Sequence, residues 1–279
     1  MGTPVAYVTF HDPDGHDDER AAVLGAWAEK GLAGRAVRWD DPDADWSAFE
    51  AAVVRSTWDY VDRRAEFVAW ARHAGERTRL FNSAEVIERN TDKTYLRDLA
   101  ARGIPIVPTH WSAQDLPAWD GYREYVVKPA ISAGARDTIR TPDPEVAARH
   151  AAALLAEGRT PMVQPYLSMV EGEGETSLIY FGRRFSHAVR RTPMLVPGAT
   201  EADNARFVRR EPAPDQLRLA EKVLAEVPGE LLYARVDLVR LADGTPVLIE
   251  LELTEPYLYL SSSPGAASRF ADALAEALG

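Results

Sequence analysis

The chain has 279 residues, of which 46% are apolar, and its 43 acidic against 32 basic side chains give a formal net charge of −11. These proportions are typical of a water-soluble folded protein that is large enough for two or three lobes. The excess of acidic residues argues against a nucleic-acid partner. No apolar run approaches the roughly 20 residues of a membrane span, which argues against a membrane protein. The lack of cysteine excludes disulfides, thiol catalysis and cysteine-ligated zinc.

Strands and helices alternate in the first part of the chain, residues 1–83, which are predicted to form one domain. Apolar runs and helical spacing place them in the order strand 5–10, helix 20–30, strand 34–39, strand 51–56, helix 63–75 and strand 78–82. Such alternation predicts a mostly parallel, twisted sheet. The opening MGTPVAYVTF has neither the charged region nor the cleavage site of a secretion signal, so a cytoplasmic protein is expected.

Two further domains are predicted, over residues 84–163 and 164–279. The middle domain is expected to hold helix 91–103, strands 107–111, 124–129 and 137–141, and helix 143–158, in which Asp143 is the N-cap. The last domain is expected to hold strands 162–167, 176–181, 185–190, 232–239 and 246–253 and helices 215–226 and 267–278. The segment 195–204 is predicted to be a mobile loop. The sequence leaves the oligomeric state open, a homo-oligomer included.

Glutamates interrupt the last apolar strand, in VLIELELTEP. Glu250 and Glu252 alternate with leucines and therefore share one face of the strand, as Arg235 and Asp237 do in YARVDLV. The turn DGTP joins the two strands as a hairpin and brings the three carboxylates together. An all-oxygen cluster of this kind selects a hard cation such as Mg²⁺, whereas the alternative is a solvated sheet face with mixed charges.

Two lysines occupy positions that suit an anionic ligand. Lys128 ends the strand EYVVKP and precedes a loop of small residues that includes Ser132, an arrangement that can grip phosphate oxygens. Lys93 is predicted to lie in the first turn of a helix, where it opposes the helix dipole unless an anion is bound. The alternatives are a lysine that extends from a strand end to water and an ordinary surface lysine.

The order of these features along the chain resembles the ATP-grasp superfamily of carboxylate ligases over essentially the whole length. A helix lysine, a strand lysine, a small-residue loop, the strand VQPYL, the acidic segment EGEGET and the two final strands follow one another as in that family. The resemblance implies an α/β protein with the ATP-grasp fold, in which a Rossmann-like parallel-sheet domain precedes two α+β lobes that grip ATP. It also implies ATP and Mg²⁺ as cofactors.

The resemblance further implies a role for each matching residue. Nucleotide binding falls to Lys93, Lys128, Ser132, to the hinge residues Gln164, Pro165, Tyr166 and Leu167, and to Glu175 or otherwise Glu173 for the ribose. Metal binding falls to Asp237, Glu250 and Glu252, and catalytic stabilisation of the transferred phosphoryl group to Arg235 and Lys128. Two departures are visible, because Glu252 stands where the family usually has asparagine and the phosphate loop is poor in glycine.

The segments VVRSTWDY, FNSAEVIERNTDK and ELELTEP resemble a narrower ATP-grasp subgroup of cycloserine-forming cyclo-ligases. The substrate is therefore expected at the carboxyl end of strand 51–56, where α/β sheets bind ligands. The expected substrate contacts are Arg55, Ser56, Thr57, Asp59, Tyr60, Arg191 and Arg206. Arginines would clamp a carboxylate and Asp59 would hold an ammonium group, whereas the alternative is that these arginines offset acidic surface neighbours.

The resemblance implies that a small amino-acid-like carboxylate is activated as an acyl phosphate. A nitrogen of the same molecule then displaces phosphate, as in the conversion of O-ureido-D-serine to D-cycloserine. Two alternatives remain at this point. One is an intermolecular amino-acid or peptide ligase, and the other is a nucleotide-binding module without turnover.

Overall fold

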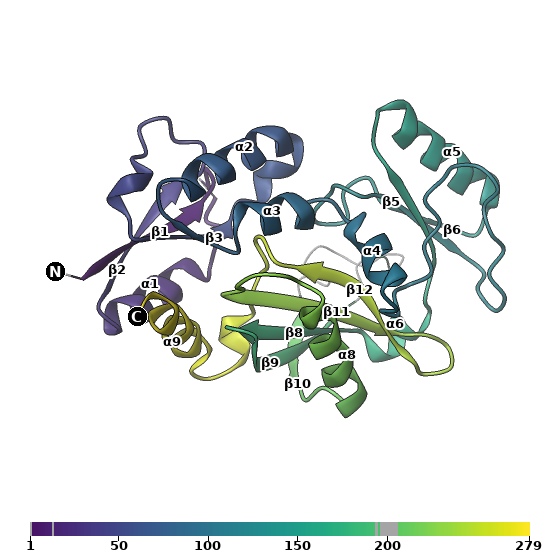
Figure 1. Ribbon diagram of the computed structural model, residues 1–279. Coiled ribbons are helices and arrows are strands. Elements are labelled where there is room, and N and C mark those ends of the chain that lie inside the picture. The colour runs from purple at the N-terminus through teal and green to yellow at the C-terminus, as the bar shows by residue number, and fades with distance from the viewer. Residues whose placement is uncertain (1, 13, 193–194, 196–205) are drawn as a thin grey trace.

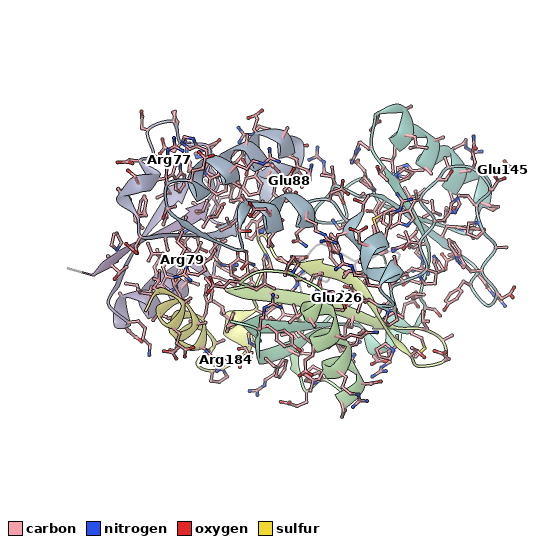
Figure 2. All side chains as sticks on the ribbon, in the orientation of Figure 1. Arg77, Arg79, Glu88, Glu145, Arg184 and Glu226 are labelled. Atoms are coloured by element: carbon pink, nitrogen blue, oxygen red, sulfur yellow. The ribbon has the colours of Figure 1, made fainter. Side chains whose placement is uncertain are left out.

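The computed structural model describes residues 2–12, 14–192, 195 and 206–279. Three sheets, each with its own helices, follow one another along the chain, and the fold is of the mixed α/β type (Figure 1). Charged side chains such as Glu145 and Arg184 project from its outer faces (Figure 2). Within the described ranges, no helix has the length and apolarity needed to cross a membrane.

The first domain is a parallel sheet with helices on both faces. Its strand order is β2 (Leu32–Arg38), β1 (Thr3–Thr9), β3 (Ala51–Ser56) and β4 (Arg79–Phe81). One face packs on α2 (Arg64–Gly75), and the other packs on α1 (Arg20–Glu29) and on α9 (Ala266–Leu278). Trp27 of α1 and Phe270 of α9 lie with their ring centroids 6.2 Å apart. The C-terminal helix therefore completes the N-terminal domain, as Figure 1 shows.

The middle lobe is a small antiparallel sheet covered by one helix. Its strand order is β6 (Ile139–Thr141), β5 (Tyr125–Pro129) and β7 (Pro161–Pro165), and the covering helix is α5 (Pro144–Ala156). Asp143 caps this helix, because its carboxylate accepts hydrogen bonds from the backbone N–H groups of Glu145 and Val146. β7 crosses the expected domain boundary between residues 163 and 164.

The third sheet is antiparallel and carries the last two strands side by side. Its order is β10 (Phe207–Arg210), β9 (Arg184–Arg191), β8 (Glu175–Phe181), β11 (Tyr233–Arg240) and β12 (Pro246–Glu252). The helices around it are α3 (Ala84–Asn90), α4 (Tyr95–Ala101), α6 (Met169–Glu173) and α8 (Pro214–Ala225). Tyr95 of α4 exchanges hydrogen bonds of 2.8 and 2.9 Å with the backbone of Leu251, which fixes α4 on β12.

Several expected elements differ in the structure. Lys93 lies in the turn between α3 and α4 rather than inside a helix, because Asp92 accepts the N–H of Thr94 and interrupts the helical run. Segment 107–111 forms no strand of its own; His110 bridges to Val163 of β7, and the Val107 N–H donates a hydrogen bond to the carbonyl oxygen of Leu248 in β12. Neither α3 nor β10 was expected. The predicted loop at 195–204 lies, apart from Leu195, outside the described residues.

Candidate active site

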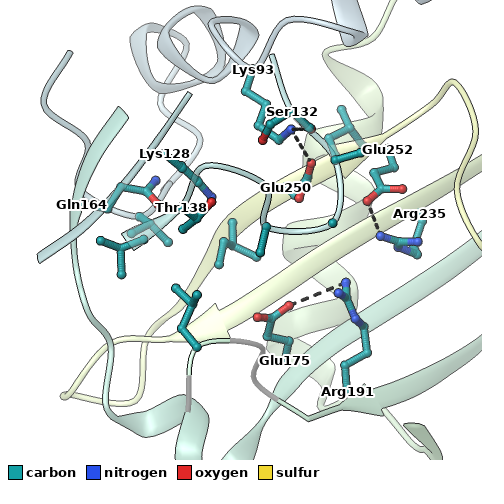
Figure 3. A pocket seen from close by; sticks show the side chains of 18 of the residues that line it. Lys93, Lys128, Ser132, Thr138, Gln164, Glu175, Arg191, Arg235, Glu250 and Glu252 are labelled. Atoms are coloured by element: carbon teal, nitrogen blue, oxygen red, sulfur yellow. Dashed lines mark hydrogen bonds and ion pairs between the residues drawn. The ribbon is translucent and has the colours of Figure 1, made fainter. Parts of the chain in front are cut away.

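A cavity of about 550 Å³ lies between the middle lobe and the third sheet (Figure 3) and is also lined by residues of the first domain. The first domain contributes Trp58 and Tyr60 from the short 3₁₀ turn η2 (Trp58–Asp62). The middle lobe contributes Lys128 from β5, and the third sheet contributes Glu250 from β12. Ligand sites commonly lie in such clefts between lobes, so this cavity is the candidate active site.

The structure gathers most of the residues expected at the site around this cavity. Those that line it are Tyr60, Lys93, Lys128, Ser132, Gln164, Pro165, Tyr166, Leu167, Glu175, Arg191, Arg235, Glu250 and Glu252. Those that do not line it are Arg55, Ser56, Thr57, Asp59, Glu173, Arg206 and Asp237.

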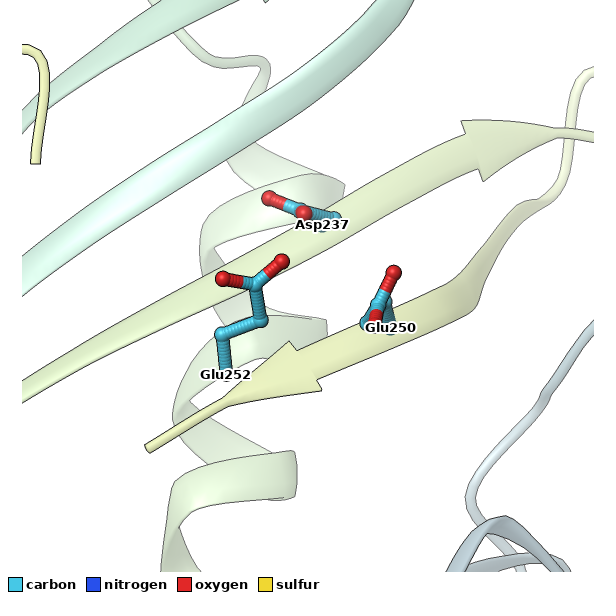
Figure 4. A group of neighbouring side chains, drawn as sticks. All are labelled: Asp237, Glu250 and Glu252. Carbon is cyan, nitrogen blue, oxygen red and sulfur yellow. The ribbon is translucent and has the colours of Figure 1, made fainter. Parts of the chain in front are cut away.

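The β11–β12 hairpin builds the predicted carboxylate cluster. Asp237 faces Glu250 and Arg235 faces Glu252 in the antiparallel register. Asp237, Glu250 and Glu252 each place an oxygen within 4.8 Å of the others, as Figure 4 shows for the three side chains. Alternation along both strands therefore puts an all-oxygen group on one face, with buried Asp237 at its base.

Cations surround this carboxylate cluster. Arg235 lies 2.9 Å from Asp237 and contacts Glu252, and Arg191 lies 3.1 Å from Asp237. Lys93 lies 3.1 Å from Glu250. Burial raises the pKa of Glu250, but the nearby Lys93 and Lys128 outweigh this effect and lower its pKa to about 2. The cluster is therefore held together by cations on every side.

Glu252 differs from its neighbour Glu250. Burial raises the pKa of Glu252 to about 7, although the adjacent Arg235 opposes this shift. A carboxyl with this pKa holds a proton part of the time at neutral pH. A bound metal ion would displace that proton, because a metal ion favours the ionised ligand.

The two lysines approach the cavity in different ways. Lys93 donates a 2.6 Å hydrogen bond to the backbone oxygen of Ser132, so it ties the turn before α4 to the loop that follows β5. Lys128 has neither an ion pair nor a hydrogen bond with any residue that the structure describes. Burial lowers the pKa of Lys128, as expected for an ammonium group removed from water. Lys128 is thus a cation that faces the cavity without a protein anion in contact.

Gly174 separates Glu173 and Glu175, the two acidic residues that the sequence offers for the ribose contact. It has a φ of +77°, and a Cβ at this position would lie 2.6 Å from the carbonyl oxygen of Arg191, so only glycine fits. On one side, Glu173 turns away and pairs with Arg210 at 2.7 Å. On the other side, Glu175 enters the cavity and lies 3.6 Å from Arg191. Figure 3 shows Glu175 pointing toward Arg191.

An apolar slot occupies one end of the cavity. Its walls belong to one hydrophobic cluster and comprise Val107, Val126, Tyr166, Leu167, Val170 and Ile249. The Arg140 guanidinium stacks 3.4 Å from the centroid of the Tyr166 ring and holds that ring in place. A flat aromatic ligand would fit between such walls, next to the backbone of β7.

Comparisons with known proteins agree with this geometry. Residues 5–82 match the family model described as the D-cycloserine synthetase DcsG N-terminal domain. The chain is 38% identical to the cycloserine biosynthesis protein DcsG of Streptomyces lavendulae over 282 residues, which cover 94% of each protein. This chain belongs to the DcsG family of ATP-grasp ligases.

Solved structures support the same assignment. The crystal structure of D-cycloserine synthetase DcsG superposes with a TM-score of 0.91 at 37% identity, over 99% of this chain and 100% of that one. A RimK domain ATP-grasp protein from Sphaerobacter thermophilus reaches a TM-score of 0.67 at 21% identity, over 97% of this chain and 98% of that one, which shows the shared fold. The expected ATP-grasp fold and the expected ligase class are therefore confirmed.

The structure places five of the seven expected substrate contacts of this DcsG-family ligase, namely Arg55, Ser56, Thr57, Asp59 and Arg206, outside the lining of the cavity. β3 continues through Ser56, so Arg55 and Ser56 are still strand residues that bury their side chains inside the domain. Arg55 pairs with Glu19 at 3.4 Å, and Ser56 donates to Asp17 at 2.5 Å. Thr57 is also fully buried. Only after the chain turns into η2 do side chains reach the cavity.

Asp59 and Arg206 also lie away from the cavity. The Asp59 carboxylate accepts a 2.9 Å hydrogen bond from the Trp39 indole and pairs with Arg63 at 3.1 Å. Arg206 is exposed beside the start of β10. Asp59 is thus engaged within its own domain, and the predicted ammonium contact at this residue has no support in the geometry.

Polar and aromatic residues without a role in the sequence analysis also line the cavity, among them Asn90, Glu255, Tyr257 and Tyr259. Tyr259 has a φ of +52°, a left-handed conformation that a tyrosine rarely adopts and that is often found at functional sites. This conformation sets the Tyr259 ring 5.6 Å from the Arg235 guanidinium. A signal was present in the alternation of aromatic residues in PYLYL, directly after the carboxylate strand. Trp58, which belongs to the segment VVRSTWDY, lines the cavity as well.

Proposed function

We propose that this ligase uses Mg-ATP to activate a small amino-acid-like carboxylate and then closes a ring within the same molecule, as in the conversion of O-ureido-D-serine to D-cycloserine. One observation carries the proposal. Lys128, which pairs with no described residue, lines the same cavity as Glu250 and Glu252 and as the two arginines behind them, and Asp237 lies at the base of that carboxylate cluster. The chain's similarity to the cycloserine biosynthesis protein DcsG supports the choice of substrate.

The donor groups fit ATP from end to end. The apolar slot suits adenine, and the backbone of Gln164–Leu167 offers polar groups at its edge. Glu175 lines the same cavity and is the better candidate for the ribose hydroxyls, since Glu173 does not line it and pairs with Arg210. Lys93 and Lys128 then remain for the phosphates.

The carboxylate cluster fits Mg²⁺, because this cation prefers several oxygen ligands and shares them with nucleotide phosphates. We assign its protein ligands to Asp237, Glu250 and Glu252. When bound, Mg²⁺ would offset negative charge on the phosphates during transfer. Arg235 holds Asp237 and Glu252 in place and presents its own positive charge to the same region.

The proposed reaction proceeds in two steps. A substrate carboxylate oxygen attacks the γ-phosphorus of ATP, which releases ADP and leaves an acyl phosphate in place of a poor leaving group. The ureido-bearing nitrogen attacks the acyl carbon, phosphate departs, and the ring closes. Water then removes the carbamoyl group as carbon dioxide and ammonia. Arg191 and Arg235 are placed to neutralise the carboxylate and the acyl phosphate, which lowers the barrier of the first step.

Product analysis tests this proposal directly. The protein is incubated with ATP, Mg²⁺ and O-ureido-D-serine, and the products are identified by mass spectrometry. ADP, phosphate and cycloserine are expected in equal amounts. If the compound is inert while a pair of amino acids releases ADP and yields a dipeptide, the ring closure is wrong and the intermolecular alternative is right.

A further inference from the structure

The carboxylates around the cavity are not equivalent in their partners. Glu175 lies against Arg191, Glu250 against Lys93, and Glu252 against Arg235. Glu255 also lines the cavity, yet it forms no ion pair with any residue that the structure describes. Of these four carboxylates, only Glu255 has no contacting cation among the described residues.

The protein holds Glu255 firmly in this position. Its side chain interacts with the phenol of Tyr60, which lines the same cavity, and its backbone carbonyl accepts a 3.2 Å hydrogen bond from the Trp58 indole. Tyr60 is itself fixed, because its ring stacks on Phe67 with centroids 4.9 Å apart. The η2 turn of the first domain and the segment directly after β12 thus meet at Glu255.

A carboxylate held inside a cavity without a cation is costly unless a ligand supplies the missing charge. We propose that Glu255, with Tyr60 beside it, binds the α-ammonium group of the amino-acid substrate. This inference rests on the proposed function, since it concerns the substrate of the same site. The ammonium site takes the part that the sequence had suggested for Asp59, whose carboxylate is engaged by Trp39 and Arg63.

The position of Glu255 also explains how the substrate would be oriented. Arg191 and Arg235 line the same cavity and suit the carboxylate that accepts the phosphoryl group. An amino acid has its ammonium and its carboxylate on one carbon, so the two contacts together fix that carbon and the direction of its side chain. Glu255 is therefore a specificity-determining residue for α-amino carboxylates.

Paired substrates with and without the amino group provide the test. The first compound is O-ureido-D-serine, and the second is 3-(ureidooxy)propanoic acid, which is identical except that it lacks the α-amino group. The ratio of their kcat/KM values is measured for the wild-type enzyme and for Glu255→Gln, which keeps the size of the side chain. The wild type should prefer the amino compound, and Glu255→Gln should lose about 10- to 100-fold on that compound while it changes little on the other.

Matched variants identify the contact. Glu255→Asp should retain part of the preference, and Tyr60→Phe, which keeps the stacked ring, should reduce it only slightly. Asp59→Asn should leave the ratio unchanged, and a collapse of the ratio in this variant would move the ammonium site to Asp59. ADP affinity, measured by calorimetry, should be the same in Glu255→Gln as in the wild type.

An equal loss on both compounds in Glu255→Gln would overturn the ammonium site, because it would show a merely structural role. The proposed function is judged separately from the product of the wild-type enzyme. If no cycloserine forms, the same comparison is made on whichever amino carboxylate triggers ADP release and on its counterpart without the amino group. An unchanged preference in Glu255→Gln would again contradict the inference.

Discussion

Arg55 and Glu19 form a buried ion pair, 3.4 Å apart, that ties the first domain to the segment after the carboxylate strand. Arg55 also donates to the carbonyl oxygen of Pro256 at 2.8 Å, and Glu19 accepts the N–H groups of Leu258 and Leu260 at 2.9 and 2.8 Å. The segment held in this way carries side chains that line the cavity. The Arg55–Glu19 pair therefore positions the cavity-lining segment after β12, although neither residue lines the cavity itself.

Replacement of Arg55 by methionine should destabilise the protein by about 3–5 kcal/mol, because it leaves Glu19 buried without a cation. Urea unfolding measures this loss. The double variant Arg55→Met, Glu19→Gln should be more stable than the sum of the two single changes predicts. A raised KM for the substrate with unchanged stability would instead restore Arg55 as a substrate contact.

Asp237→Asn and Glu250→Gln should each nearly abolish turnover and leave the fold intact. An amide has almost the size of a carboxylate but is a far weaker ligand for Mg²⁺. Glu252→Asn should have a milder effect, because asparagine is the residue usual at this position in the wider ATP-grasp family. Initial rates over a range of Mg²⁺ concentrations measure these effects, and near-normal Mg²⁺-dependent rates in the first two variants would rule out the metal assignment.

The hairpin part of the site could be predicted from sequence because it is local. Two strands joined by a short turn place alternate residues on one face, so Asp237 and Glu250 had to meet once DGTP was recognised as a turn. The lysines were placed by their order along the chain. The predicted helical conformation of Lys93 was nevertheless wrong, because Asp92 interrupts the expected helix before α4 begins.

The substrate end could not be predicted in this way. The direction of Arg55 is set by Glu19 and by the aromatic rings of Tyr233 and Phe270, which come from distant parts of the chain. The spacing of apolar residues along the sequence cannot predict a contact between residues so far apart in the chain. Glu255 was visible in ELELTEP, but its significance depends on the absence of a contacting cation among the described residues, which only three-dimensional placement can show.

Lys93 and Lys128, which we propose to bind the phosphates, should respond differently to replacement by methionine. Lys128→Met should weaken ADP binding by about 1.5–3 kcal/mol, the value of a charge-assisted hydrogen bond. The same change should leave the free protein as stable as before or more stable, because Lys128 is a charge without a contacting anion among the described residues. Lys93→Met should weaken ADP binding too but should destabilise the free protein, because Glu250 loses its partner. Calorimetric titration and urea unfolding distinguish the two, and unchanged ADP affinity in both variants would place the nucleotide elsewhere.

The KM of the amino substrate should depend on pH through Glu255. Burial raises the pKa of Glu255 to about 8, and the charges of Glu252 and Glu250 add to this effect, while the Tyr60 hydrogen bond and Lys93 oppose it. Only the ionised carboxylate can pair with an ammonium group. With this pKa the ionised fraction grows about ninefold from pH 6 to 7 and about fivefold from pH 7 to 8, so the KM should fall in that range and level off near pH 9.

Two controls isolate the group responsible for this slope. The slope should be missing for 3-(ureidooxy)propanoic acid, which has no ammonium group, and missing for the amino substrate in Glu255→Gln. Titration of Glu252, with its pKa of about 7, would instead affect both compounds alike, because it acts on the metal and phosphate side of the cavity. If the slope persists in Glu255→Gln, Glu255 is not the group whose ionisation admits the substrate.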